Sequence, residues 1–302
     1  MSKILFLFVL SSIFINVNSQ YPTVLIHGIF SNKNEMTELR THIKECIQTM
    51  DIYNIEIGDG EITSIFMDMN KQCETLSQNI EKLNISAQKI NLIGISQGGL
   101  LARCYVERYS DEVKEVDNLI TIATPHMGIY QRLFDTKLIL NRIDTESSIK
   151  YKSSLLSISD YWKDPFDYLL YYTTNPFLVY INNGKEHKDS LKYKENLSKL
   201  SNFVLFWSSI DSIIVPFESA KFEFYDILKA EKEQELVVQF LKESPIYDYD
   251  YIGLKELDET SRMHIYQIDC LHNEFKLSSC FDLVKNEKTD KTLLELIIGY
   301  LE

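Results

Sequence analysis

The sequence lacks the surplus of basic residues that nucleic-acid-binding proteins carry. Its 302 residues include 31 lysines and arginines against 44 aspartates and glutamates, which gives a formal net charge of −13 at pH 7. Binding to phosphates needs clustered Lys and Arg side chains, so we expect no nucleic-acid partner. An acidic surface of this kind suits a soluble protein of an acidic compartment.

After the N-terminus the sequence also lacks an apolar run long enough to span a membrane, which takes about 20 residues. The N-terminus itself joins Lys3 to an apolar run from Ile4 to Ile15, followed by the compact residues Val17-Asn18-Ser19. This order predicts a secretory signal peptide over residues 1–19, cleaved after Ser19. An uncleaved membrane anchor is the alternative, but the apolar run is short for it.

No internal repeat and no low-complexity linker divides the remainder, and a chain of this length can bury a full core. Residues 20–302 are therefore predicted to form one domain. Short β-branched runs alternate with helical patterns, which is typical of a mostly parallel sheet flanked by helices. The predicted strands are 23–26, 62–67, 90–93, 119–122, 203–207 and 264–268, and the predicted helices are 35–50, 73–83, 97–109, 229–242 and 289–300.

The segment from about 128 to 200 has no clear strand pattern and is rich in Tyr, Phe and Leu. We predict that it is a helical cap inserted between strands of the sheet. Its apolar residues, among them Leu169, Leu170 and Phe177, could line a groove for an acyl chain, or they could simply pack the cap.

Gly94-Ile95-Ser96-Gln97-Gly98 is a G-x-S-x-G motif with an apolar strand before it and a helical pattern after it. This context is the one that a nucleophile elbow requires. Glycines on both sides of Ser96 remove the side chains that would clash in so sharp a turn. Ser96 would then lie at a helix N-terminus, where free N–H groups favour negative charge. The motif predicts Ser96 as a catalytic nucleophile.

A serine hydroxyl is a weak nucleophile and needs a general base. His272 follows the last predicted strand, at the edge of the sheet where the base of an α/β-hydrolase belongs. The other five histidines lie too early in the chain, on polar segments or at the start of a strand: His27, His42, His126, His187 and His264.

The acid that orients the base should end the preceding strand. Asp211 is the first carboxylate after the strand 203–207, and Glu218 is the second candidate. Asp211 would hold the neutral imidazole in the right tautomer and stabilise the imidazolium. Serine, acid and base then follow one another in the chain order of the α/β-hydrolase fold, which we predict for this protein.

An oxyanion hole needs backbone N–H groups aimed at the developing alkoxide. The residue after the nucleophile, Gln97, should supply one of them, and the loop after the first strand should supply the other. That loop contains His27-Gly28-Ile29, and we expect the N–H of Ile29 to be the donor and all three residues to contact substrate. We expect no metal and no other cofactor.

Five cysteines leave at least one without a partner within the chain. Since the chain is predicted to be exported, we expect a disulfide between Cys270 and Cys280, which would enclose His272 in a short loop. Cys73 and Cys104 lie on helices predicted to flank the sheet on one side and could also pair, which would leave Cys46 free. The alternative is that all five are reduced.

Two sequons, Asn84-Ile85-Ser86 and Asn196-Leu197-Ser198, make Asn84 and Asn196 candidate glycosylation sites.

Several segments resemble the palmitoyl-protein thioesterases, over most of the chain from about Pro22 to the last strand. They are His27-Gly28-Ile29, Gly94 to Gly99, Tyr193 to Leu197, Val215-Pro216 and Ile252 to Glu256. The segment Gly253 to Glu256 is similar to the first main type of the family, whereas Pro125, Met127-Gly128 and the cysteines around His272 are more similar to the second. The resemblance implies a soluble lysosomal enzyme that hydrolyses fatty-acyl thioesters, with Ser96, Asp211 and His272 as nucleophile, acid and base.

The expected function is therefore hydrolysis of long-chain acyl thioesters, such as the palmitoyl-cysteine of proteins or peptides, or acyl-CoA, in the lysosome or outside the cell. One alternative is a lipase or carboxylesterase acting on oxygen esters, since Thr124 to Gly128 also resembles a stretch found in lipases. A non-catalytic lipid carrier is a further alternative, which the complete Ser, Asp and His set disfavours.

Overall fold

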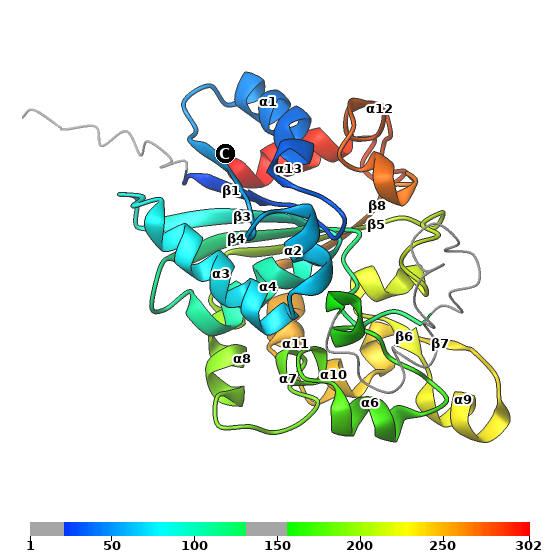
Figure 1. Ribbon diagram of the computed structural model, residues 1–302. Coiled ribbons are helices and arrows are strands. Elements are labelled where there is room, and N and C mark those ends of the chain that lie inside the picture. The colour runs from blue at the N-terminus through cyan, green and yellow to red at the C-terminus, as the bar shows by residue number, and fades with distance from the viewer. Residues whose placement is uncertain (1–20, 131–155) are drawn as a thin grey trace, which may run out of the picture.

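The computed structural model describes residues 21–130 and 156–302 (Figure 1). The predicted signal peptide and part of the predicted cap, residues 131–155, lie outside the described residues. At the centre is a six-stranded sheet in the order β2-β1-β3-β4-β5-β8, with every neighbouring pair parallel. Its strands are β1 (Thr23–Ile26), β2 (Ile52–Ile55), β3 (Lys89–Ile95), β4 (Glu115–Ile122), β5 (Asn202–Trp207) and β8 (Met263–Gln267). With helices on both faces, this is the predicted α/β-hydrolase fold.

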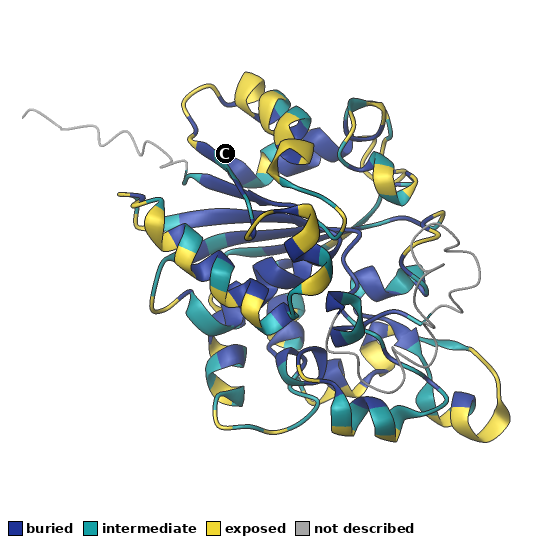
Figure 2. Ribbon diagram, in the orientation of Figure 1, coloured by how far each residue is buried: buried dark blue, intermediate teal, exposed yellow. Residues whose placement is uncertain are grey.

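Helices cover both faces of the sheet, so the central strands β1, β3, β4 and β5 are buried on both sides (Figure 2). One face packs against α1 (Thr37–Cys46) and α13 (Leu293–Leu301). The other packs against α3 (Met69–Lys82) and α4 (Gln97–Tyr109). Adjacent strand residues belong to opposite cores, as expected of a period of two: Leu92 faces α4, and Ile93 faces the α1 side.

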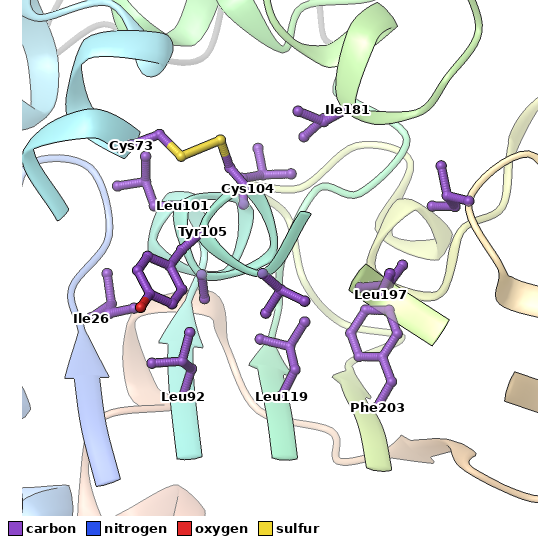
Figure 3. Close-up of a cluster of buried hydrophobic side chains, with 14 of the residues drawn as sticks. Ile26, Cys73, Leu92, Leu101, Cys104, Tyr105, Leu119, Ile181, Leu197 and Phe203 are labelled. Carbon is purple, nitrogen blue, oxygen red and sulfur yellow. A yellow bond between two sulfur atoms is a disulfide. The ribbon is translucent and has the colours of Figure 1, made fainter. Parts of the chain in front are cut away.

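The helix α4, which follows the predicted nucleophile, lies across the sheet (Figure 3). Its buried side chains Leu101 and Tyr105 pack toward strand residues such as Leu92 and Leu119. A disulfide between Cys73 and Cys104 joins α3 to α4. The middle of α4 is thus anchored both by apolar burial and by a covalent bond.

Two insertions extend from the sheet on the α4 side (Figure 1). Between β4 and β5 the described residues form η3 (Ser157–Asp160), α6 (Tyr168–Thr174), α7 (Leu178–Ile181) and α8 (Ser190–Ser198), the last of which packs against α4. Between β5 and β8 lie η4 (Phe217–Lys221), β6 (Phe224–Tyr225), α9 (Ile227–Glu233), β7 (Val238–Gln239), η5 (Leu241–Glu243), α10 (Pro245–Asp248) and α11 (Leu254–Glu259). Beyond β8 come η6 (His272–Glu274) and α12 (Ser278–Phe281). None of the helices in 21–130 and 156–302 is long and apolar enough to cross a bilayer.

Two predicted elements were wrong. The segment 62–67 is not a strand but part of the helix α2 (Glu61–Phe66), and β2 is the strand at that edge of the sheet. The turn before α2 uses Gly58 and Gly60 at positive φ, and the Asp59 carboxylate accepts a 2.8 Å hydrogen bond from the Thr63 N–H, which favours a helical start. The predicted helix 229–242 ends early, because Gln234 turns into the left-handed region after α9.

Candidate active site

Ser96 lies in the turn between β3 and α4, with φ 55° and ψ −127°. Such a left-handed conformation is uncommon for a residue with a side chain and marks a strained turn. The elbow is possible because a Cβ on Gly94 would overlap the backbone of Gly98, and a Cβ on Gly98 would overlap the carbonyls of Ile26 and His27. The strained backbone presents the Ser96 side chain above the carboxyl ends of the strands.

His272 and Asp211 meet Ser96 from two neighbouring strands. Asp211 follows β5 and His272 follows β8, and these strands pair in parallel. His272 Nε2 lies 3.0 Å from Ser96 Oγ, and His272 Nδ1 lies 2.7 Å from Asp211 Oδ2. The side chains of His272 and Asp211 are only 9% and 2% exposed. The structure therefore brings together three residues that are far apart in the sequence.

The Asp211 carboxylate is fully occupied as an acceptor. Its second oxygen, Oδ1, accepts hydrogen bonds from the N–H groups of Ile213 and Ile214 at 2.8 and 3.0 Å. A carboxylate only accepts, so the proton of neutral His272 lies on Nδ1 and the lone pair of Nε2 faces the Ser96 hydroxyl. The second acid candidate, Glu218, lies on η4 and makes no hydrogen bond to His272 within the described part of the chain. Burial raises the pKa of Glu218.

The predicted oxyanion donors are Gln97, which follows Ser96 in the chain, and Ile29, which follows Gly28. A Cβ on Gly28 would lie 3.1 Å from Ser96 Cβ, so the loop after β1 touches the nucleophile. Among residues 21–130 and 156–302, neither the Ile29 N–H nor the Gln97 N–H donates to another protein group. Two free donors beside a candidate nucleophile are the arrangement that a developing oxyanion requires.

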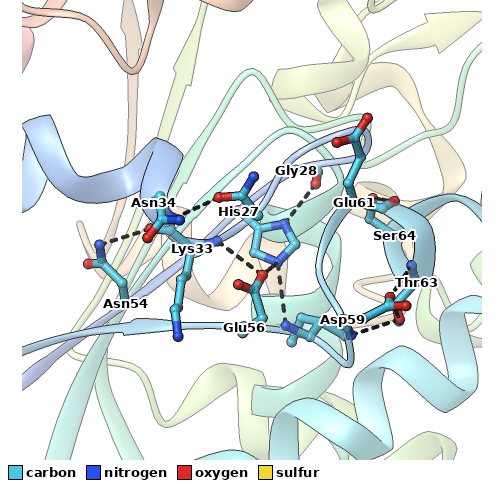
Figure 4. A network of polar contacts seen from close by, with 12 residues as sticks. His27, Gly28, Lys33, Asn34, Asn54, Glu56, Asp59, Glu61, Thr63 and Ser64 are labelled. Atoms are coloured by element: carbon cyan, nitrogen blue, oxygen red, sulfur yellow. Dashed lines mark hydrogen bonds and ion pairs between the residues drawn. The ribbon is translucent and has the colours of Figure 1, made fainter.

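His27 was expected to contact substrate, but its ring points into the protein and the residue is only 2% exposed. Its Nδ1–H donates to the Gly28 carbonyl at 2.9 Å, and its Nε2 lies near Glu56 and the Ile57 N–H (Figure 4). The Gly28 carbonyl and the Ile29 N–H belong to one planar trans peptide and point in opposite directions. His27 therefore fixes the direction of the Ile29 N–H, and burial lowers the pKa of this imidazole.

The side chain of Gln97 is held by a buried polar network that the sequence did not predict. Its Nε2 donates to the Ser64 carbonyl at 2.9 Å and to Gln72 Oε1 at 3.1 Å. Its Oε1 accepts from Ser157 Oγ at 2.9 Å and from the Tyr161 hydroxyl at 3.0 Å. No motif marks these four partners, which come from α2, α3 and the insertion after β4.

The disulfide between Cys270 and Cys280 encloses His272 in the loop that it closes. Both cysteines are buried, and Ser208 Oγ donates to the Cys270 carbonyl at 2.8 Å, which ties this loop to the end of β5. Cys46 is free and exposed. The predicted pairs and the free cysteine are thus all found in the structure.

Of the predicted acyl-groove residues, the structure places Phe177 toward the end of α4 that is far from Ser96. Phe177 is fully buried, and its ring lies 5.6 Å from the guanidinium of Arg108. Arg108 is twelve residues beyond Ser96 along α4, which at about 1.5 Å per residue is about 18 Å. Leu169 is 68% exposed on α6, and Leu170 is half-buried. Phe177 is a core residue, because its ring packs at the far end of α4.

The two candidate glycosylation sites differ in how far they are exposed. Asn84 is exposed in the loop after α3. Asn196 is only 2% exposed, and its amide donates to the Glu107 carbonyl at 3.1 Å and to Asp111 at 3.0 Å. The expectation for Asn196 is corrected, since a glycan on that nitrogen would need both an exposed amide and the loss of these bonds.

Residues 22–272 match the family model described as palmitoyl protein thioesterase. The chain belongs to this family. Residue for residue, it is 37% identical to palmitoyl-protein thioesterase 3 of Dictyostelium discoideum, over 85% of this chain and 87% of that protein. It is 30% identical to lysosomal thioesterase PPT2-B of Xenopus laevis, over 84% and 86%. As a palmitoyl protein thioesterase family member with this fold, it is a hydrolase of the thioesterase class. Within the described residues, no group of three or more His, Cys, Asp or Glu side chains is placed to hold a metal ion.

Proposed function

We propose that the protein hydrolyses long-chain fatty-acyl thioesters through an acyl-enzyme on Ser96, with His272 as general base and Asp211 as the acid that orients it. The observation that carries the proposal is the continuous chain of contacts, 3.0 Å from Ser96 to His272 and 2.7 Å from His272 to Asp211. A nucleophile, a base and an orienting acid within hydrogen-bond reach form the unit that acyl transfer needs.

The steps follow from this geometry. His272 Nε2 takes the hydroxyl proton as Ser96 Oγ attacks the thioester carbonyl carbon. The carbonyl oxygen becomes an oxyanion that accepts from the N–H groups of Ile29 and Gln97. The carbon–sulfur bond then breaks, and the imidazolium returns its proton to the departing sulfur. Water, activated by His272, attacks the acyl-enzyme and releases the fatty acid, which restores Ser96.

A thiolate leaves readily, because a thiol pKa is about 8.5. The site therefore depends more on stabilising the oxyanion than on a strong general acid. A thioester substrate is compatible with this site, and the family supports it, with palmitoyl-cysteine of proteins or peptides, or acyl-CoA, as its chemical form.

Exposed apolar side chains support the acyl part of the proposal. Phe30 follows the predicted oxyanion donor, Ile210 and Ile213 flank Asp211, and Leu271 precedes His272; each is more than a third exposed. Every methylene of an acyl chain buried against such surface contributes roughly 0.8 kcal/mol. These four residues, rather than Leu169, Leu170 and Phe177, are the acyl contacts that we propose.

We also propose that the protein acts in the lysosome. Relatives named lysosomal thioesterases support this location.

Replacement of Ser96 by Ala tests the proposal. It deletes one hydroxyl, so we expect turnover of palmitoyl-CoA to fall by several orders of magnitude while the melting temperature stays within a few degrees. The wild type, but not Ser96→Ala, should be labelled by a fluorophosphonate probe. Normal turnover by Ser96→Ala would refute the mechanism.

A matched pair of substrates, palmitoyl-CoA and an oxygen ester of palmitate, tests the substrate class. We expect a higher kcat/KM for the thioester. A preference for the oxygen ester would identify a lipase or carboxylesterase instead, and acyl-chain binding without turnover of either would identify a carrier.

A further inference from the structure

Ser64 lies on α2 and is only 1% exposed. It contacts the loop that carries the Ile29 N–H and the side chain of Gln97, the two proposed oxyanion donors. Its hydroxyl oxygen accepts a hydrogen bond from the Phe30 N–H at 3.0 Å. Its carbonyl accepts from Gln97 Nε2 at 2.9 Å and from Ser157 Oγ at 2.6 Å. One residue thus joins the loop after β1 to the residue after the nucleophile.

The hydroxyl of Ser64 has only one arrangement that satisfies these contacts. Its proton is donated to the Glu61 carbonyl at 2.6 Å, so a lone pair remains to accept from Phe30. Phe30 needs such support, because its φ of 55° is unfavourable for a residue with a side chain. The Ser64 hydroxyl therefore holds the strained residue directly after Ile29.

The loop is held on its other side by His27, which binds the Gly28 carbonyl. The peptides before and after Ile29 are then both fixed, the first by His27 and the second by Ser64. The direction of the Ile29 N–H depends on these two bonds together, since a peptide plane turns only at its two flanking dihedrals.

The carbonyl of Ser64 acts on the second donor. The Gln97 side chain is held at Nε2 by Ser64 and Gln72, and at Oε1 by Ser157 and Tyr161. A side chain with all four bonds made in a buried site has one orientation, and it fixes the first residue of α4, whose N–H is the other proposed donor.

We propose that Ser64 is a positioning residue that sets the separation and direction of the Ile29 and Gln97 N–H groups; this rests on the proposed function of those groups. A donor displaced by a fraction of an ångström stabilises an oxyanion less, although it binds the neutral thioester almost as well. The role of Ser64 is therefore confined to the transition state.

Ser64→Ala tests this role, since it removes the acceptor for Phe30 and leaves the Ser64 carbonyl in place. We expect kcat to fall about tenfold with KM nearly unchanged. Affinity for a fatty-acyl trifluoromethyl ketone, whose adduct with Ser96 carries an oxyanion, should fall by a similar factor. Affinity for the matching unreactive acyl amide, which has no oxyanion, should stay within twofold.

Thr63→Ala is the matched control. Thr63 is the neighbour of Ser64 on α2. Its hydroxyl is hydrogen-bonded to Asp59 in the preceding turn, and not to Phe30 or Gln97. We expect wild-type kcat from this variant. Equal losses in Ser64→Ala and Thr63→Ala, or equal weakening of ketone and amide, would show that α2 matters only as structure and would overturn the proposal.

The outcome is separable from that of the proposed function. If Ser96→Ala is inactive and Ser64→Ala has wild-type kcat, the positioning role alone is refuted. If Ser64→Ala does not fold, Ser64→Cys replaces it, because sulfur is a weaker acceptor of similar shape. A wild-type kcat and ketone affinity in Ser64→Cys would then refute the role.

Discussion

The residues on the two sides of Ser96 are held in different ways. On the acid–base side, Asp211 and His272 are held by an ionisable contact and by the Cys270–Cys280 disulfide. On the oxyanion side, the loop with Ile29 is held by hydrogen bonds to His27 and Ser64, and the Gln97 side chain is held by hydrogen bonds to uncharged groups that include Ser64. The difference matches the proposed chemistry, since an imidazole changes charge in each cycle, whereas backbone dipoles only have to stay in place.

The largest effect is expected from substitutions on the acid–base side. His272→Ala and Asp211→Asn should each lower kcat by about 10³–10⁴, because the serine then lacks a correctly oriented base. The double variant should be barely worse than either single one, since the residues act as a unit. Glu218→Gln is the matched control and should keep kcat near wild type. A severe loss in Glu218→Gln with a mild one in Asp211→Asn would transfer the acid role to Glu218.

Removal of either disulfide is expected to have an effect of intermediate size, and the two disulfides differ in how close they lie to the site. Cys270→Ala with Cys280→Ala should lower stability by about 2–3 kcal/mol and also lower kcat several-fold, since the loop that carries His272 is released. Cys73→Ala with Cys104→Ala should lower stability by about 3–4 kcal/mol in the same chain-entropy model and leave kcat unchanged. Urea unfolding and steady-state kinetics measure the two effects. Equal losses of kcat would show that the first disulfide has no special relation to the site.

The smallest expected effect concerns pH on the oxyanion side. Asp160 ends η3, the helix that also carries Ser157, and its carboxyl accepts from the Met69 N–H at 2.7 Å. Burial, reinforced by the nearby Asp68, raises the pKa of Asp160 to about 6 from an ordinary value of 3.8. The folded state therefore favours the protonated acid. This contribution to stability is complete below about pH 4 and is lost as the pH rises through about 6.

Asp160→Asn should remove this dependence, because the amide keeps an acceptor for Met69 and does not ionise. We expect the wild type to lose on the order of 2 kcal/mol of unfolding free energy between pH 4 and 7 from this group, and the variant to show a correspondingly flatter profile. Asp51→Asn, at an exposed carboxylate, should leave the profile unchanged. Parallel profiles for the wild type and Asp160→Asn would contradict the assignment.

The contrast between the two sides also explains what could be predicted from the sequence. Ser96, Asp211 and His272 each follow a strand of the sheet, and a residue type suited to chemistry shortly after a strand is a local signal. The Cys270–Cys280 pair was likewise predictable from its short spacing around His272. The central strands were found because they are β-branched and buried on both faces.

The oxyanion side gives no comparable signal. Ser64 lies within the six-residue segment 62–67, which is too short for its pattern to distinguish a strand from a helix, and the turn at Gly58 and Gly60 precedes the helix α2. The bonds of Ser64 to Phe30 and Gln97 join residues more than thirty positions apart. A serine in a short apolar run is ordinary in any sequence, so its role emerges only in three dimensions.

The pairing of β5 with β8 has a consequence for how this molecule can vary. Trp207 and Gln267 are register partners near the ends of the two strands, and Asp211 and His272 follow shortly after them. The separation between acid and base is therefore set by strand register and not by the long excursion that connects the strands. Insertions or deletions in the segment between η4 and α11 could change this part of the molecule while the reacting groups keep their spacing. The segment between Asp211 and His272 can therefore vary in length without changing the spacing of these two residues of the proposed triad.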